Sequence, residues 1–153
     1  MLAHEAPPLT HLLTLCQSSF QSQKRLFEKV AEECEQAFQL PRETVYRELL
    51  AREKLGSTAI GEGVAIPHCR IEDCDKPVGC LITLDQPIEF SSPDGIGVDI
   101  IFVLLVPKTA TEDHLKLLSF IATTLSEDEN RTALREASDS PQLHTIMMTG
   151  QSA

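Results

Sequence analysis

Apolar residues recur at helical spacing in the first third of the chain. Over about residues 23–38 they fall on one face of a predicted helix, which Ser22 can cap at its amino end. Pro41 suits the first turn of a second helix, over about residues 42–54, and Gly56 ends that helix. The predicted inward positions are Leu26, Phe27, Val30, Ala31, Cys34 and Phe38 in the first helix and Val45, Leu49 and Leu50 in the second.

The middle of the chain has the patterns of loops and strands. Residues 56–63 are rich in Gly, Ser and Thr, which is typical of a loop. Pro67 disfavours the helical conformation in the residue before it, so the segment that leads to it is extended. The predicted extended segments are 64–67, 78–84, 87–90 and 98–106. The last of these is apolar at every position except Asp99, which indicates a central strand covered on both faces.

Helical spacing returns in the last third. A helix over about residues 112–125 is predicted to turn an apolar face towards the sheet. Ser126 and Glu129 have the spacing of a capping box that starts a further helix, to about Ala137, and Ser140-Pro141 opens a final helical segment. The predicted inward positions of the 112–125 helix are Leu115, Leu118, Ile121, Ala122 and Leu125.

The order of these elements predicts the fold class. Helices, then strands, then helices again indicate an α/β domain with a mixed β-sheet flanked by helices. A chain of 153 residues has the size of one compact domain, and no repeat or Gly/Ser/Pro-rich linker divides it. We therefore predict a flexible N-terminal lead over residues 1–8 and a single domain over residues 9–150.

Charge and hydropathy disfavour two classes of partner. The thirteen basic and twenty-three acidic residues give a formal net charge of −10, which disfavours nucleic acid because phosphate contacts supply most non-specific affinity. The longest apolar runs, such as residues 100–106, are too short to cross a bilayer, so no membrane insertion is predicted. The first eight residues lack the basic and apolar regions of a secretion signal, and we expect a cytoplasmic protein.

The five cysteines give no disulfide framework. Their odd number and irregular spacing predict reduced thiols. Cys69, Cys74 and Cys80 lie close together in the sequence, next to His68, but no C-x-x-C pair is present and we predict no metal site. A thiol or zinc sensor built from these three cysteines remains an alternative function.

His68 follows Pro67, where the extended segment meets a turn. One nitrogen of a neutral imidazole can attack phosphorus while the other donates a hydrogen bond that fixes the tautomer. The rigid backbone beside Pro67 limits how far such a nucleophile moves from in-line geometry. Cys69 would point to the opposite face of the extended chain, so His68 is badly placed to act as its base. Taken alone, this pattern also fits a turn histidine with no chemistry.

His114 lies in the first turn of the helix that follows the most apolar strand. In open α/β sheets ligands collect at the carboxyl ends of strands, and helix amino ends bind anions. Its spacing to Leu118 and Ile121 predicts an imidazole directed towards the sheet. A histidine that caps or packs at the edge of the core is the open alternative.

Arg52 is a third candidate, at the end of the 42–54 helix. Its guanidinium presents a fork of donors that matches phosphate oxygens. A cation at a helix end also complements the helix macrodipole, and this second explanation applies equally to Lys54.

Five sequence blocks carry a family resemblance. They are Arg52 to His68, which ends in Gly61-Glu-Gly-Val-Ala-Ile-Pro-His68, then Leu84-Asp-Gln-Pro-Ile-Glu-Phe90, Pro93-Asp-Gly95, Val98 to Pro107 and His114-Leu-Lys-Leu-Leu-Ser119. Within about residues 23–147, the chain resembles the IIA component of the bacterial phosphoenolpyruvate-dependent phosphotransferase system, in its fructose/mannitol-like superfamily. The resemblance is closest to the nitrogen-regulatory IIA proteins.

The resemblance implies a phosphoryl carrier. His68 would accept a phosphoryl group at Nε2 from a phosphohistidine of an HPr-like carrier protein, His114 would orient or stabilise the phosphohistidine, and Arg52 would neutralise phosphate charge. No cofactor is implied, because the donor is already activated and the protein must supply positioning and charge stabilisation. The family fold, a mixed sheet flanked by helices, agrees with the pattern of elements.

Two further points follow from the resemblance. Gly56, Ser57 and Thr58 would supply backbone or hydroxyl donors to the phosphate. Cys69 departs from the family, which usually has Gly or Ala after its phosphorylated histidine. A larger side chain there could crowd a docking partner, and it places an oxidisable thiol beside the nucleophile.

The predicted function is that of a carrier and regulator, which accepts phosphate and then regulates target proteins according to its phosphorylation state. The alternative within the family is a sugar-transport IIA component that passes phosphate to a IIB partner. Absence of an attached IIB or membrane IIC segment favours the regulator.

Overall fold

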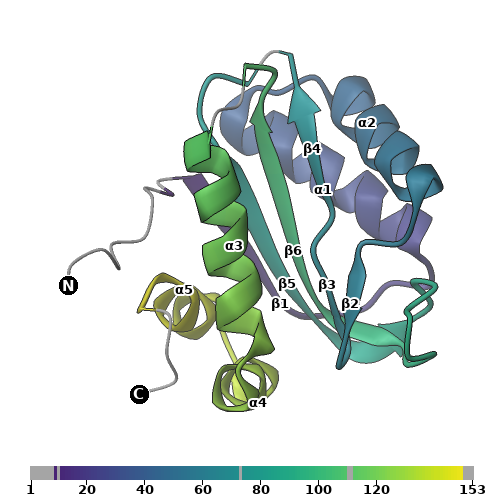
Figure 1. The fold of residues 1–153 in the computed structure, drawn as a ribbon, viewed down its shortest axis with the longest axis vertical. Coiled ribbons are helices and arrows are strands. Elements are labelled where there is room, and N and C mark those ends of the chain that lie inside the picture. Colours follow the sequence, from purple (N-terminus) through teal and green to yellow (C-terminus); the bar gives the residue numbers. More distant parts are fainter. Residues whose placement is uncertain (1–8, 10, 73, 110–111, 150–153) are drawn as a thin grey trace.

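The computed structural model describes residues 9, 11–72, 74–109 and 112–149, and in this part of the chain a six-stranded mixed sheet is flanked by five helices (Figure 1). The elements are β1 (His11–Ser18), α1 (Gln23–Phe38), α2 (Arg42–Leu55), β2 (Ala59–Gly61), β3 (Val64–Ala65), β4 (His68–Ile71), β5 (Val78–Ile88), β6 (Val98–Pro107), α3 (Glu112–Ser126), α4 (Asp128–Glu136) and α5 (Ser140–Thr149). The predicted fold class is confirmed. The predicted lead over residues 1–8 lies outside the described residues.

The sheet is built around β6. The strand order is β1-β5-β6-β3-β2, and β4 also pairs with β6. β5 runs antiparallel to β6, whereas β3 and β4 run parallel to it, one after the other along the same edge. Between β3 and β4 the Pro67 carbonyl accepts a hydrogen bond from the Leu104 amide at 2.9 Å. This pairing fixes the backbone immediately before His68.

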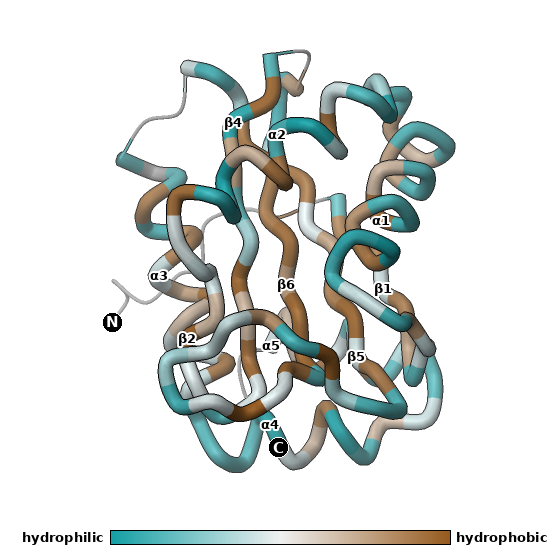
Figure 2. Tube along the Cα trace, turned by 90° about the vertical axis from the view of Figure 1, so that its right-hand side faces the viewer, coloured by the Kyte–Doolittle hydropathy of each residue, from teal (hydrophilic) through white to brown (hydrophobic). Residues whose placement is uncertain are grey.

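Hydrophobic side chains fill the space on both faces of the sheet. Alternate residues of β6 point to opposite faces, as expected for a strand, so Ile101, Val103 and Leu105 pack beneath α1 and α2. Ile100, Phe102 and Leu104 pack on the other face against α3, α4 and α5. Figure 2 shows the resulting brown, hydrophobic course of β6 through the middle of the molecule. The prediction of a central strand covered on both faces is confirmed.

Three strands were not predicted. β1 precedes α1 and pairs parallel with β5. Its leucines alternate between the two cores, Leu13 and Leu15 on the α1 side and Leu12 on the α3 side, so its sequence lacks a polar face. β4 continues beyond Pro67, where the sequence predicted a turn, because pairing with β6 keeps residues 68–71 extended. β2 is a third, short strand within the predicted loop over residues 56–63.

Other boundaries shift in ways that have local causes. The predicted strands 78–84 and 87–90 form one strand, β5, whose pairing with β6 is irregular between Thr83 and Ile88. The predicted capping box is wrong: α4 begins after Glu127, and the Ser126 hydroxyl donates instead to the Ala122 carbonyl at 2.7 Å within α3. A serine hydroxyl can bond the preceding helical turn in this way instead of capping the next helix.

The inward face of α3 also differs from the prediction. Leu115 is 65% exposed, whereas Leu117 is 1% exposed and belongs to the core. Because leucines occupy positions 115, 117 and 118, the sequence pattern fits more than one inward face. Ile121 and Leu125 are buried as predicted.

Candidate active site

A cavity of about 360 Å³ lies between the sheet and α3. β4 and β6 form one wall and the first turns of α3 form the other. Its lining combines two imidazoles, a guanidinium and a carboxylate with apolar side chains, the mixture expected of a site that orients a polar group. The lining residues are His68, Cys69, Arg70, Leu104, Val106, Glu112, His114, Leu115 and Leu118.

His68 is held in a defined tautomer. Its Nδ1 lies 2.7 Å from the Ile66 carbonyl oxygen. A carbonyl oxygen accepts but does not donate, so Nδ1 must carry the hydrogen, and in a neutral imidazole the lone pair then resides on Nε2. The Pro67 carbonyl is itself bonded to the Leu104 amide, which fixes the backbone around the ring. In this tautomer the lone pair of a neutral His68 ring lies on Nε2, the nitrogen that the Ile66 contact leaves available.

His114 approaches the same cavity from the helix. It lies in the first turn of α3 and is half-buried. The structure thus brings together the two histidines that the sequence singled out, one from the sheet and one from a helix amino end. Backbone N–H groups at such an end favour a bound anion.

Arg52 reaches the surroundings of the site from the other face of the sheet. It lies in the last turn of α2, and its Nη1 donates to the Gly56 carbonyl at 2.9 Å. Burial is the main cause that raises the pKa of Cys69, the neighbour of His68, and the positive charge of Arg52 opposes this rise only in part. The guanidinium is therefore within electrostatic range of β4. Among the described residues, however, Arg52 does not belong to the cavity lining.

The predicted phosphate donors Gly56, Ser57 and Thr58 lie in the loop after α2, outside the cavity lining. The Thr58 hydroxyl donates to the Glu53 carboxylate at 2.8 Å, and the Thr58 amide donates to the same group at 3.0 Å. The Ser57 hydroxyl donates to the Phe90 carbonyl at 2.5 Å. These bonds hold the loop to α2 and to the segment that follows β5. This placement offers no support for the predicted contact with phosphate.

Cys69 faces away from His68, as expected for neighbours on a strand. It packs against the core beneath α1 and α2, and burial raises the pKa of its thiol to about 12. Burial likewise raises the pKa of Cys34 to about 12. Such thiols stay protonated near neutral pH and are poor nucleophiles. In the described part of the chain no three His, Cys, Asp or Glu side chains are grouped to hold a metal ion.

Besides Glu112, sequence reasoning missed one other charged residue of the cavity, Arg70. It stands two positions after His68 on β4, so both side chains leave the same face of the strand. This spacing is visible in the sequence, but it has meaning only once residues 68–71 are known to form a strand.

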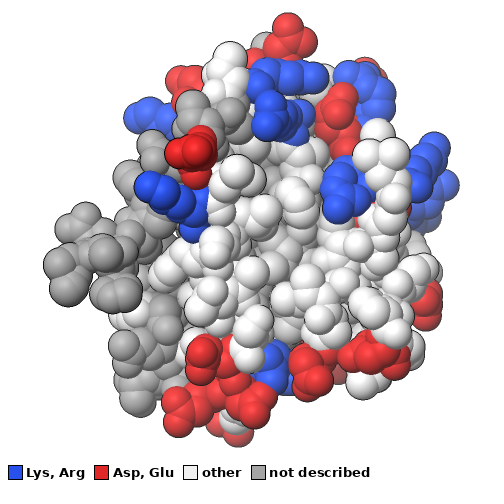
Figure 3. All heavy atoms as spheres, viewed as in Figure 1, with Lys and Arg blue, Asp and Glu red and all other residues white. Residues whose placement is uncertain are grey.

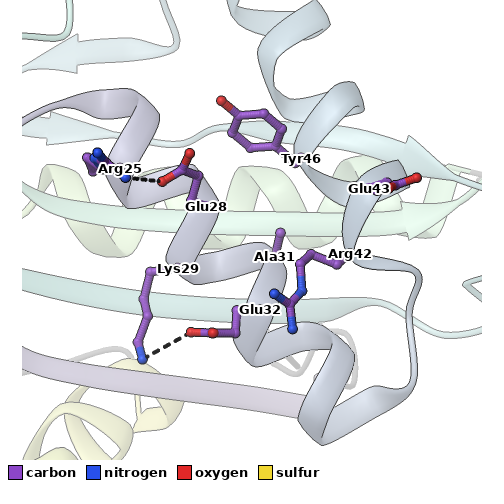
Figure 4. A pocket seen from close by; sticks show the side chains of 8 residues that line it. All are labelled: Arg25, Glu28, Lys29, Ala31, Glu32, Arg42, Glu43 and Tyr46. Carbon is purple, nitrogen blue, oxygen red and sulfur yellow. Dashed lines mark hydrogen bonds and ion pairs between the residues drawn. The ribbon is translucent and has the colours of Figure 1, made fainter.

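A larger hollow, of about 480 Å³, lies between α1 and α2 (Figure 4). Most of its charged side chains form ion pairs: Arg25 pairs with Glu28 at 3.0 Å and Lys29 with Glu32 at 3.4 Å. Arg42 pairs with Glu35 at 2.9 Å. Such ion pairs are ordinary features of helix surfaces, and His68 lies elsewhere.

The whole domain matches a known family. Residues 8–149 match the family described as phosphoenolpyruvate-dependent sugar phosphotransferase system, EIIA 2. The chain belongs to this family. It is therefore a phosphotransferase-system IIA protein, a component that transfers phosphoryl groups. No helix in the described ranges of this IIA protein has the length and apolar character needed to span a membrane.

Curated relatives and solved structures show which members of the family this chain is similar to. A nitrogen regulatory protein of Pseudomonas aeruginosa is 44% identical over 133 residues, which are 85% of each chain. The protein of that name from Escherichia coli is 40% identical over 128 residues, 83% of this chain and 78% of the relative. The crystal structure of IIA-Ntr from Neisseria meningitidis matches with a TM-score of 0.82 at 40% identity, covering 92% of this chain and 94% of that one. The IIA mannitol structure from Escherichia coli, at 14% identity and a TM-score of 0.74 over 88% of this chain and 94% of that one, shares the fold.

Proposed function

We propose that this IIA protein accepts a phosphoryl group on Nε2 of His68 from the phosphohistidine of an HPr-like carrier, and that it regulates target proteins according to its phosphorylation state. The observation that carries the proposal is the hydrogen bond from His68 Nδ1 to the Ile66 carbonyl, which leaves the Nε2 lone pair for attack. The Nε2–P bond forms as the donor's N–P bond breaks, and the bonding electrons return to the donor's imidazole nitrogen. No cofactor is needed, since the donor phosphohistidine is already activated.

Two neighbours of His68 are assigned supporting roles in this proposal. His114 orients or stabilises the phosphohistidine, since it lines the same cavity from α3. Arg52 offsets phosphate charge from the α2 side, where its positive charge already acts on Cys69. Charge stabilisation of this kind is the main contribution a protein makes to phosphoryl transfer.

The surface around the cavity suits a protein donor. Leu115 is 65% exposed and lines the cavity, which gives a partner an apolar contact beside His68. Figure 3 shows most Lys and Arg of this face in the half that holds the ends of β4 and α2, whereas the end near α4 is mainly acidic. An incoming phosphohistidine is anionic, and its approach is favoured at the more basic half.

The regulatory role is supported by the names of the relatives. Nitrogen regulatory proteins from several bacteria cover most of the chain at 38–44% identity. The sugar-transport alternative is supported by the 2-O-alpha-mannosyl-D-glycerate-specific EIIABC component of Escherichia coli, which is 35% identical over 103 residues, 66% of this chain and 15% of the relative. A solved complex joins Escherichia coli IIA mannitol to phosphorylated IIB mannitol. The two roles differ in whether phosphate passes onward to a IIB domain. The cytoplasmic location expected from the sequence stays a prediction.

Incubation with phosphoenolpyruvate, enzyme I and an HPr-type carrier tests the proposal. We expect a mass increase of one phosphoryl group, and phosphorus NMR should assign it to a histidine Nε2. His68→Ala should abolish the increase, whereas His144→Ala, at an exposed position of α5, should leave it intact. Undiminished labelling of His68→Ala would contradict the proposal. Transfer of the label to a IIB domain would favour the sugar-transport role.

A further inference from the structure

The geometry points to Arg70 as the residue whose guanidinium binds the phosphoryl group on His68 from the α3 side of the sheet. This inference rests on the proposed function and adds a residue that neither the family resemblance nor the sequence pattern assigned. It differs from the role given to Arg52, which approaches from α2.

The first argument is the register of β4. His68 pairs with Leu104 and Arg70 pairs with Val106, and both partners belong to the core on the α3 side. Cys69 and Ile71, the alternate residues, pack on the α1 and α2 side. His68 and Arg70 therefore project from the same face, about 7 Å apart along the strand. A long arginine side chain can span that separation to reach oxygens carried on Nε2.

The second argument is the state of the Arg70 side chain. It is exposed and lines the cavity together with both histidines. Within the described part of the chain it makes one hydrogen bond, from Nη1 to the Lys108 carbonyl at 3.2 Å. A guanidinium has five N–H donors, so this bond anchors the group beside the β6–α3 loop and leaves further donors for a ligand.

The third argument is the charge balance of the cavity. Glu112 places a carboxylate in the lining, and phosphorylation would add a further charge of about −1.5 to −2, if phosphohistidine resembles phosphoserine. Arg70 supplies the guanidinium of this lining. Hydrogen bonds from a guanidinium to phosphate oxygens are directional as well as attractive, so Arg70 can both offset the repulsion from Glu112 and hold the phosphoryl group. The Nε2–P bond and its cleavage are unchanged by this contact.

The test compares phosphoryl transfer from a phosphorylated HPr-type carrier to the intact protein and to Arg70→Gln and Arg70→Lys. Losing charged hydrogen bonds predicts that kcat of Arg70→Gln falls by about tenfold to a hundredfold, with KM changed less. Arg70→Lys should recover part of kcat, because it keeps the charge and loses the fork. Arg47→Gln is the matched control, since Arg47 is exposed on α2 and pairs with Glu48, and it should transfer at the normal rate.

A second readout separates contact with phosphate from contact with the partner. After the donor is removed, the half-life of the phosphorylated state should differ between the intact protein and Arg70→Gln. A variant with raised KM but normal kcat and normal half-life would overturn the inference, because Arg70 would then contact only the carrier. Circular dichroism and thermal melting should show that Arg70→Gln folds normally. Retained phosphoryl labelling of His68→Ala would contradict the proposed function itself. If His68→Ala takes up no label but Arg70→Gln has a normal kcat, only the role of Arg70 is contradicted.

Discussion

His68 and His114 line one cavity from opposite sides, His68 from the start of β4 and His114 from the first turn of α3. Two rules bring them together. Parallel pairing with β6 sets His68 opposite Leu104, near the carboxyl end of the central strand. The connection from that strand end to α3 then returns the helix amino end to the same edge, where ligands of open α/β sheets collect.

Because His114 lines the same cavity as His68, we expect a mutation at His114 to slow phosphorylation of His68 without abolishing it. His114→Gln keeps a polar side chain of similar size but loses the imidazole, so kcat for phosphorylation of His68 should fall by about tenfold to a hundredfold, as for a lost hydrogen bond to a charged group. The label should still reach His68, more slowly. Rapid-quench labelling with the phosphorylated carrier measures this rate, and His144→Gln serves as the control. A normal rate in His114→Gln would reduce His114 to a packing residue.

A mutation at Thr58 distinguishes two roles for its hydroxyl, which are to hold the loop after α2 in place and to bind the phosphoryl group. Its side chain is 5% exposed and its hydroxyl donates to Glu53. Thr58→Val should lower the free energy of unfolding by about 1–3 kcal/mol, because the half-buried Glu53 carboxylate loses a hydrogen-bond donor. The transfer rate at a temperature where the variant is fully folded should stay normal. Urea unfolding and labelling measure the two quantities, with Thr145→Val, at an exposed position of α5, as the control.

A different result for Thr58→Val would support the phosphate-binding role that the family resemblance implies for Thr58. If Thr58→Val were as stable as the natural protein but transferred phosphate slowly, its hydroxyl would act on the phosphoryl group and not on the loop.

Much of this arrangement follows from the sequence, and the rest depends on contacts between distant residues. α1 is fixed by the local spacing of residues such as Leu26, Val30 and Cys34, and β6 by its unbroken apolar run. The convergence of His68 and His114 follows from the general rule about strand ends. The strand β4 could not be predicted in this way, because Pro67 looks locally like the end of an extended segment. Residues 68–71 are extended because they pair with β6. Arg70 was missed for the same reason.

The role of Arg52 is a second feature that its local sequence leaves undecided. The sequence could not separate a phosphate ligand from a helix-end cation. In the structure it bonds the Gly56 carbonyl at the end of α2, as a capping cation does, while its charge also reaches Cys69. Its contact with phosphate stays a prediction.

The buried thiols predict loss of stability at alkaline pH. Burial raises the pKa of Cys34 and Cys69 from an ordinary value of 9.0 to about 12 in the folded protein. Above pH 9 the unfolded chain releases these protons while the folded chain keeps them, so the free energy of unfolding decreases as the pH rises from about 9 towards 12. Below pH 9 both states are protonated and these groups add no slope.

Urea midpoints at pH 7.5 and pH 10 measure this effect. Other groups also titrate in the alkaline range, so the informative comparison is with the double variant Cys34→Ala and Cys69→Ala. We expect a smaller fall in stability between the two pH values for the double variant, whatever its stability at pH 7.5. Equal falls would show that the two thiols are not the cause.

The last prediction separates two leucines that the sequence pattern could not. Leu117 is 1% exposed in the core, so Leu117→Ala should lower the free energy of unfolding by about 2–5 kcal/mol through the cavity it leaves. Leu115 is 65% exposed at the rim of the cavity, so Leu115→Ala should change stability by no more than about 0.5 kcal/mol.

Their effects on phosphoryl transfer should be reversed. Leu115→Ala removes an apolar contact beside His68 and should raise KM for the carrier with kcat unchanged, the result of weaker docking. Leu117→Ala should leave KM normal while the variant is folded. Ile96→Ala is the matched control, because Ile96 is 54% exposed just before the start of β6, at the opposite end of that strand from the cavity. If Ile96→Ala raised KM as much as Leu115→Ala, general loss of surface hydrophobicity would explain both, and the carrier would not dock specifically over the His68 cavity.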